Sequence, residues 1–210
     1  MAKNAFELSL VSVRLAETGK PRRRATSHAV TAALVWPRTG TARKEYAMVR
    51  EFQKGVADLA DAPWHESILC RESVDGTFAV HVEVSEALSD SAADSFLATF
   101  AGLLLRGAVS AVGRADLALA DPLSAIFSTA SKKTTKTASP GAIAAGTVTL
   151  EPDALRDGLL LEIPLTAPAA VTVSTPETIP GQRGVSRTRK TLLAKGAPNG
   201  TAVLRFRLIG

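Results

Sequence analysis

The sequence predicts an antiparallel β-sandwich, and three observations lead to this fold class. Apolar and polar residues alternate over several short stretches, which is typical of strands with one buried and one solvated face. Glycine and proline turn signals separate these stretches at irregular spacing. Hydrophobic residues make up 46% of the 210-residue chain and aromatic residues 5%, so a core of mainly Val, Leu, Ile and Ala is available. We expect one domain over residues 1–210.

The first two expected strands lie in the N-terminal part of the chain. Phe6 to Leu15 alternates, and the phase of the alternation shifts at Leu10-Val11, which indicates a β-bulge. A polar loop with three consecutive arginines, Glu17 to Ser27, follows. The second strand is His28 to Trp36, and Pro37 ends it.

The next stretches predict the centre of the sheet. Glu45 to Leu59 fits either an amphipathic helix or two strands around Lys54-Gly55, and we favour the strands. Two alternating runs, His65 to Arg71 and Thr77 to Val84, flank Asp75-Gly76. This pattern predicts a β-hairpin with Trp64 at its entrance.

After the hairpin the period of the apolar residues changes to that of a helix. Phe96, Phe100 and Leu104 recur at helical spacing, and Ser89 or Ser91 is suited to cap the first turn. We therefore expect an inserted or covering α-helix within residues 89–127. The small and polar residues 128–146 are typical of a flexible loop.

Strands are expected again in the last third of the chain, and a loop-rich stretch, Thr175 to Asn199, precedes the final one. The alternating segments are Thr147 to Leu150, Gly158 to Leu165, Ala170 to Ser174 and Ala202 to Ile209.

Part of this pattern resembles the C-two-type domain, a β-sandwich that binds calcium and phospholipid. The matching residues are Pro63, Trp64, His65 and Glu66, followed by Phe78, Val80, Val82 and Val84. The resemblance implies a sandwich scaffold with adhesive loops. It does not extend to calcium, because the family's calcium loops need closely spaced aspartates, and Glu17 to Ser27 contains none.

Charge is segregated along the sequence. Between residues 14 and 54 ten basic residues face three acidic ones, and between residues 55 and 130 eleven acidic residues face three basic ones. After Glu177 seven basic residues occur and no acidic one. Such a chain is suited to bind an anionic surface with its ends, or a second copy end to middle, although an ordinary solvated surface fits the same pattern.

Two basic clusters are the candidate partner-binding residues. Arginine side chains suit phosphate and carboxylate groups, so protein, nucleic acid and anionic membrane are all conceivable partners. No aromatic residues interleave with the clusters, which favours a protein partner or self-association over nucleic acid. The residues are Arg22, Arg23, Arg24, Arg183, Arg187, Arg189 and Lys190.

The sequence shows no catalytic, cofactor or metal motif. His28, His65 and His81 are dispersed, and the pair His65 and His81 forms a minimal metal site only in a suitable strand register. The single cysteine, Cys70, is expected to be a buried apolar residue. We therefore expect no cofactor, no metal and no enzymatic activity.

The functional prediction is a non-enzymatic binding or assembly module that contacts a protein partner or an acidic surface through basic loops. A structural subunit of a larger particle, of the phage or secretion type, is the alternative, and an unrecognised enzyme is the second alternative. A cytoplasmic location is expected, because the N-terminus lacks a continuous apolar region and Arg106 interrupts the longest apolar stretch.

Overall fold

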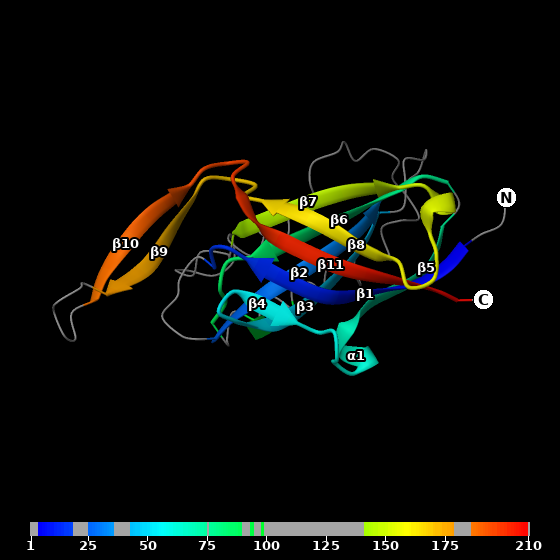
Figure 1. Ribbon diagram of the computed structural model, residues 1–210, viewed down its shortest axis with the longest axis horizontal. Helices are drawn as coiled ribbons and strands as arrows, with labels where there is room; N and C mark the ends of the chain where they lie inside the picture. Colours follow the sequence, from blue (N-terminus) through cyan, green and yellow to red (C-terminus); the bar gives the residue numbers. More distant parts are fainter. Residues whose placement is uncertain are drawn as a thin grey trace.

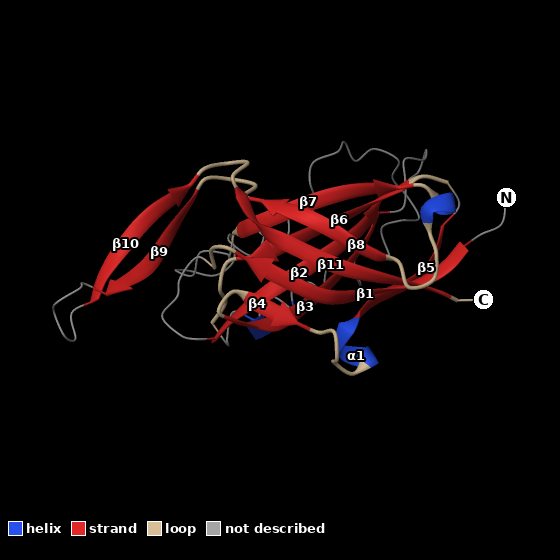
Figure 2. Cartoon of the chain, in the orientation of Figure 1, coloured by secondary structure: helices blue, strands red, loops and turns tan. Residues whose placement is uncertain are grey.

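A computed structural model describes residues 4–18, 25–35, 43–74, 76–89, 93–94, 98, 141–178 and 186–209. Strands make up most of the described chain (Figure 2). The described strands are β1 (Asn4–Leu15), β2 (Ala25–Val35), β3 (Arg43–Gln53), β4 (Val56–Asp58), β5 (Ile68–Val74), β6 (Phe78–Ser85), β7 (Ala142–Leu150), β8 (Leu160–Thr166), β9 (Val171–Thr178), β10 (Ser186–Leu193) and β11 (Pro198–Leu208). The short helix α1 spans Trp64–Ser67, and the 3-10 turn η1 spans Pro152–Ala154.

Eight of these strands close into an antiparallel barrel (Figure 1). Their order is β11-β8-β7-β6-β2-β3-β4-β1, and β1 pairs with β11 to close the ring. A ninth strand, β5, pairs with the first half of β1, while β4 pairs with its second half. Strands β9 and β10 form a separate two-stranded ribbon that extends away from the barrel (Figure 1).

The predicted antiparallel β-sandwich with an inserted or covering α-helix is therefore wrong. The strands form one closed sheet because β1 has ladder partners along both edges. A shift in register between Leu10 and Ser12 confirms the bulge that the sequence predicts in this strand. The described helical residues are those of α1, a single turn, together with Ala93, Asp94 and Ala98, so no long helix lies among the described residues. The long helix expected within residues 89–127 falls almost wholly outside the described residues.

The predicted hairpin at Asp75-Gly76 is also wrong. Strands β5 and β6 follow one another in sequence, but β5 pairs with β1, whereas β6 pairs with β2 and β7. The residues that begin the expected strand, His65 and Glu66, lie in α1, and β5 starts only at Ile68. Alternation identified strand residues here but carried no information on which strands are neighbours.

Strands β3 and β4 agree with the sequence prediction, whereas β2, β7, β9 and β10 include residues that were expected to form loops. Strands β3 and β4 flank a tight turn in which Lys54 has φ 52° and Gly55 has φ 80°, so the two-strand interpretation is confirmed. Strand β7 begins at Ala142, inside the stretch expected to be a loop, and β2 begins at Ala25. The stretch from Thr175 to Asn199, also expected to be a loop, contains the end of β9 and all of β10.

The barrel interior is a packed core. The ring centroids of Phe6 and Phe206 lie 5.2 Å apart, and those of Phe6 and Phe78 lie 5.8 Å apart. His28 packs edge-on against Phe52 with a centroid distance of 4.6 Å. Small barrels are commonly filled by side chains in this way, and the filling leaves the outer surface as the place for recognition.

His28 is held in one tautomer by its partners. Its Nδ1 lies 2.8 Å from the carbonyl oxygen of Ser85, which only accepts, so Nδ1 carries the proton. Its Nε2 therefore accepts from the Thr26 hydroxyl at 2.8 Å. Burial lowers the pKa of His28, and the hydrogen bond to Ser85 opposes that shift. The neutral ring thus ties the start of β2 to the end of β6.

Candidate functional site

The ribbon of β9 and β10, called the arm below, is the candidate functional site. Eight residue pairs, from Val171↔Leu193 to Thr178↔Ser186, form its antiparallel ladder. Neither strand pairs with any strand of the barrel among the described residues. The arm therefore has two outer edges whose backbone groups are not used by the nine-stranded sheet.

A hydrogen-bonded neck joins the arm to the barrel. The arm leaves between β8 and β11, which pair directly with each other. The Ala167 amide donates to Ala197 O at 2.9 Å, and the Gly196 amide donates to Ala167 O at 2.8 Å. Ala167 is buried, and Gly196 has φ 81°, a left-handed conformation suited to the bend. The neck thus separates the arm from the core.

The arm is basic. Its two strands contain Arg187, Arg189 and Lys190 but a single acid, Glu177, so their formal charge is 3 − 1 = +2. The register pairs Arg187 with Glu177 and Arg189 with Thr175. Arg187, Arg189 and Lys190 are all residues of β10, and the Lys190 side chain is exposed. The arm therefore has a net positive formal charge.

The structure brings together part of the predicted basic set. Arg187, Arg189 and Lys190 lie within four successive positions of one strand, β10. Arg22, Arg23, Arg24 and Arg183 lie outside the described residues. The sequence predicted a loop here, but the described basic residues lie on a regular ribbon. A ribbon holds the backbone positions of these residues at fixed spacing, which a loop does not.

Apolar surface accompanies the charge near the base of the arm. Leu192 is 67% exposed, the highest value among the exposed large hydrophobic residues described. Its register partner Thr172 is also exposed. An exposed leucine beside a basic strand is suited to contact a protein surface, where apolar contacts add to ion pairs.

A second unusual region lies where β3 faces β5. Strand β3 pairs with β2 along one edge, but on the other edge its ladder to β4 is the single pair Gln53↔Val56. Strand β5 pairs only with β1 in the described chain. We call the space between β3 and β5, with no ladder across it, the β3–β5 gap.

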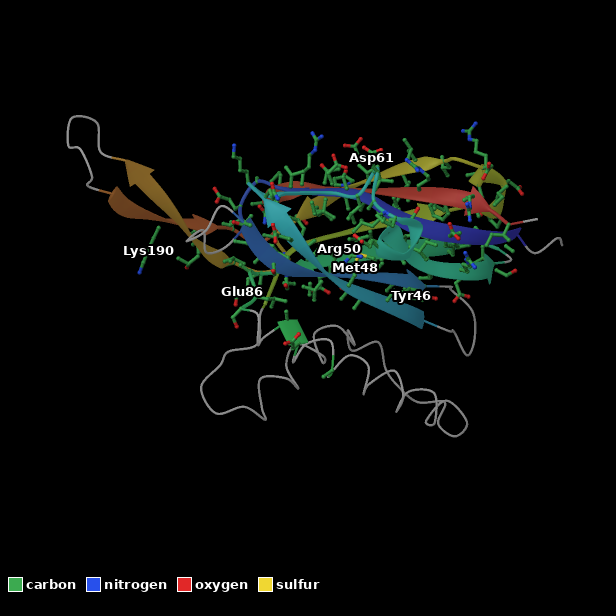
Figure 3. The ribbon with its side chains drawn as sticks, turned by 90° about the horizontal axis from the view of Figure 1, so that it is seen from below. Tyr46, Met48, Arg50, Asp61, Glu86 and Lys190 are labelled. Atoms are coloured by element: carbon green, nitrogen blue, oxygen red, sulfur yellow. The ribbon has the colours of Figure 1, made fainter. Side chains whose placement is uncertain are left out.

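One polar side chain bridges the β3–β5 gap, and a second ties β3 to α1 beside it. The Tyr46 hydroxyl donates to the Glu72 carboxylate, and the Arg50 guanidinium donates to the carbonyl oxygens of Val49 and Glu66. Figure 3 shows Tyr46, Met48 and Arg50 in a row along β3. The Arg50 Nε is buried without a hydrogen-bond partner. The Tyr46–Glu72 hydrogen bond thus links β3 to β5 in place of a backbone ladder.

The environment of Tyr46 disfavours its ionisation. Burial raises the pKa of Tyr46 above its ordinary value, and the hydrogen bond to Glu72 and the proximity of Cys70 raise it further. Tyr46 is the only tyrosine and Cys70 the only cysteine in the chain. The strand expected from the sequence, His65 to Arg71, ends before Glu72, so nothing in the sequence indicated that Tyr46 and Glu72 are partners.

The three histidines do not form a common site. His28 is buried in the barrel, His65 belongs to α1, and His81 lies on β6. The Nδ1 atom of His81 lies 2.8 Å from the Thr147 hydroxyl, and its Nε2 lies 4.0 Å from a Glu83 carboxylate oxygen. In the described part of the chain, no three His, Cys, Asp or Glu side chains are grouped to hold a metal ion.

One ion-pair cluster is structural. Glu7 on β1 is buried and accepts from Arg71 of β5 at 2.9 Å and from Arg207 of β11 at 3.1 Å. It therefore ties together three adjacent strands on the outside of the barrel. Both of its arginine partners are more than half exposed.

Comparison with known proteins adds no family assignment. Within the described residues, no helix has the length and apolar character required to cross a membrane. No family model matches the sequence, and no curated protein is significantly similar to it.

Proposed function

We propose that this protein is a non-enzymatic binding or assembly module that contacts an acidic surface of a protein partner through its arm. The observation that carries the proposal is the arm itself, a regular basic ribbon that lies outside the packed barrel (Figure 1). An isolated two-stranded ribbon is at best marginally stable in water. A surface that completes the arm's ladder or neutralises its charge would stabilise it.

The chemistry of the arm favours carboxylate groups as its target. Arginine presents a planar fork of donors that matches a carboxylate, and Lys190 adds an exposed ammonium group. Exposed edges of the ribbon can also accept a further strand through backbone hydrogen bonds. Both features are suited to an acidic protein surface that contains an open strand edge.

Nucleic acid is a weaker candidate for this arm. Residues 171–193 include no Phe, Trp or Tyr, so the arm lacks the stacking platforms on which single-stranded bases are held. The two strands of the arm offer three cations for phosphate contacts. An anionic membrane is disfavoured in the same way, since Leu192 is the arm's one exposed large apolar residue among those described.

A structural subunit of a larger particle is the second candidate. The observation that favours it is the neck, which projects the arm away from the core while the barrel remains closed. Subunits of assemblies use such extensions to reach a neighbour. This candidate differs from the first in the number of copies that bind, which mass measurement under native conditions determines.

The test compares binding of polyglutamate, a carboxylate polymer, to three proteins. The arm variant carries Arg187→Gln, Arg189→Gln and Lys190→Gln. The control removes the same charge from exposed barrel and loop positions, with Arg14→Gln, Arg156→Gln and Arg205→Gln. We expect the arm variant to bind about tenfold more weakly than the control. Equal binding by the two variants would overturn the proposal.

Salt and nucleic-acid titrations separate the partner classes. Binding to polyglutamate should weaken with salt, because exposed charges are screened over about 8 Å at physiological ionic strength. A single-stranded DNA probe should bind more weakly than polyglutamate at matched charge. If DNA binds more tightly than polyglutamate, with a steep salt dependence, and the Arg22→Ala, Arg23→Ala, Arg24→Ala variant loses this binding, then the partner is nucleic acid and not protein.

A further inference from the structure

One proline determines the hydrogen-bonding phase of the arm. In an antiparallel ladder, opposed residues alternate between pairs that exchange two N–H···O bonds and pairs that exchange none. Thr188 is opposed to Pro176, and proline has no N–H to donate, so this pair exchanges none. The backbone groups of both residues therefore point away from the ladder, and the same holds for every second pair along the arm.

The outer edge of β10 is a complete template for another strand. The residues of β10 whose N–H and C=O groups point away from β9 are Ser186, Thr188, Lys190 and Leu192, called the β10 edge below. None of these groups has a ladder partner among the described strands. Each position of the β10 edge offers one donor and one acceptor, which is the pattern that an added strand requires.

The outer edge of β9 is interrupted at its centre. Its outward-facing positions are Thr172, Ser174, Pro176 and Thr178. Pro176 offers no donor, and because its ring is bonded to the backbone nitrogen, the ring fills the position from which an N–H would reach an added strand. Proline on an edge strand is a common protection against pairing. The arm therefore has one protected edge and one open edge.

The charge of β10 selects the chemistry of the added strand. Arg187, Arg189 and Lys190 belong to β10, and the strand contains no acidic residue. Like charges that lie opposite each other on two paired strands are destabilising, whereas opposite charges are stabilising. A β10 strand from a second copy would bring three more cations, but an acidic segment brings the complementary charge. The sequence of β10 thus opposes self-pairing and favours an acidic partner.

We propose that the β10 edge binds an extended acidic segment of a partner protein, which joins the arm as a third, antiparallel strand. This inference rests on the proposed function and specifies the segment and the edge that binds it. The segment carries acidic residues opposite Arg187, Arg189 and Lys190, and an aliphatic residue opposite Leu192, whose side chain is 67% exposed. A third strand also stabilises the arm, because an isolated two-stranded ribbon is marginal in water.

The probe is a fluorescent peptide, Val-Thr-Glu-Glu-Thr-Glu-Thr, whose residues lie in this order opposite positions 192 to 186 of β10. N-methylation of its third and fifth residues removes two N–H groups that face the β10 edge. N-methylation of its fourth and sixth residues removes two that face solvent and leaves the charge equal. Against the full-length protein, we expect the first modified peptide to bind about tenfold more weakly than the unmodified peptide. The second should bind as the unmodified peptide does.

Two proline variants of the full-length chain test the same edge from the protein side. Thr188→Pro removes an N–H from the β10 edge, and Ser174→Pro removes one from the outer edge of β9. Both positions belong to pairs that exchange no ladder bond, so both variants keep the ladder of the arm. We expect Thr188→Pro to bind the peptide about tenfold more weakly and Ser174→Pro to bind it as the wild type does. Circular dichroism checks that both variants are folded.

Failure of this inference is distinguishable from failure of the proposed function. If the unmodified peptide does not bind, or if the two methylated peptides bind alike, strand addition is wrong, even where polyglutamate still requires the arm cations and the proposed function stands. If Ser174→Pro weakens binding and Thr188→Pro does not, the β10 edge is the wrong edge. If the wild-type chain dimerises without peptide and Thr188→Pro prevents it, the occupant is a second copy and the acidic segment is wrong.

Discussion

At two joints, β7–β8 and β3–β5, neighbouring strands share at most one ladder pair, and the two joints are held together in different ways. At the β7–β8 joint, the ladder is the single pair Ala145↔Thr166, and the backbones approach so closely that a Cβ on Gly146 would lie 2.3 Å from Pro164 O. Across the β3–β5 gap no ladder forms; the Tyr46–Glu72 hydrogen bond joins the two strands instead, and Arg50 joins β3 to α1 beside the gap. One joint is closed by close packing of backbone and the other by polar side chains.

This difference indicates which pair of strands in the closed sheet separates more easily. Ile163 and Leu165, beside Gly146, are buried in the core, so opening the β7–β8 joint exposes apolar surface. Opening the β3–β5 gap exposes the buried Cys70 and Val74, but it breaks side-chain contacts and no backbone ladder. Because no ladder hydrogen bond is lost there, we expect the barrel to open at β3–β5 first.

The largest effect is expected at the tightly packed joint. Gly146→Ala places a methyl group against Pro164 O and Ile163, so one strand must shift. We expect a loss of about 1–3 kcal/mol in the free energy of unfolding, measured by urea denaturation. Gly141→Ala is the matched control, because a Cβ there has no neighbour within 4 Å. Equal stability of the two variants would show that β7 and β8 are not in close contact.

A smaller loss is expected at the side-chain joint. Tyr46→Phe removes the hydrogen bond to Glu72 and should lower the free energy of unfolding by about 1 kcal/mol. Thr77→Val serves as the comparison, since it removes a 2.7 Å hydroxyl bond to Glu151 at an exposed site and should cost less. If Tyr46→Phe costs as much as Gly146→Ala, the two joints do not differ as described.

Local opening can be followed through the single cysteine. Cys70 lies on β5 beside the β3–β5 gap and is buried, so a thiol reagent reaches it only when the structure opens. Tyr46→Phe should raise its labelling rate by about fivefold, in proportion to the population of the opened state. Gly141→Ala should leave the rate unchanged. A rate that tracks global stability in every variant would mean that the gap does not open on its own.

The smallest effect is spectroscopic. Because the folded-state pKa of Tyr46 is raised, its ultraviolet titration should have a midpoint above the ordinary value of about 10. The stability that comes from this neutral phenol is fully present below the unfolded-state pKa. It is lost as pH rises through the folded-state pKa. A midpoint at the ordinary value would place Tyr46 in water.

The sequence predicted strands better than it predicted their partners. Alternation located β1 and its bulge, and Lys54-Gly55 located the β3–β4 turn, because both signals are local. The hairpin expected at Asp75-Gly76 failed since strand pairing depends on residues far apart, such as Phe6 and Glu72. The same limitation led to the prediction of a sandwich. A closed sheet and two packed sheets have the same alternation along each strand.

The candidate site was partly visible in the sequence. Composition identified Arg187, Arg189 and Lys190, because charge clusters are local, but Pro176 and the nearby glycines suggested a loop where a ribbon forms. The β3–β5 gap was not visible. Its bridges join Tyr46 to Glu72 and Arg50 to Glu66, and pairs separated by 26 and 16 residues leave no periodic trace in a single sequence.

The neck at Ala167 and Ala197 has a consequence for how such a protein can diversify. Since β8 and β11 pair directly with each other on the barrel side of the neck, the barrel closes without any contribution from the arm. Changes in the length, charge or sequence of the arm therefore leave the core unaltered, and a barrel with a different ribbon would fold by the same contacts. Selection can then act on recognition and on folding separately, and the arm is the natural place to graft a new specificity.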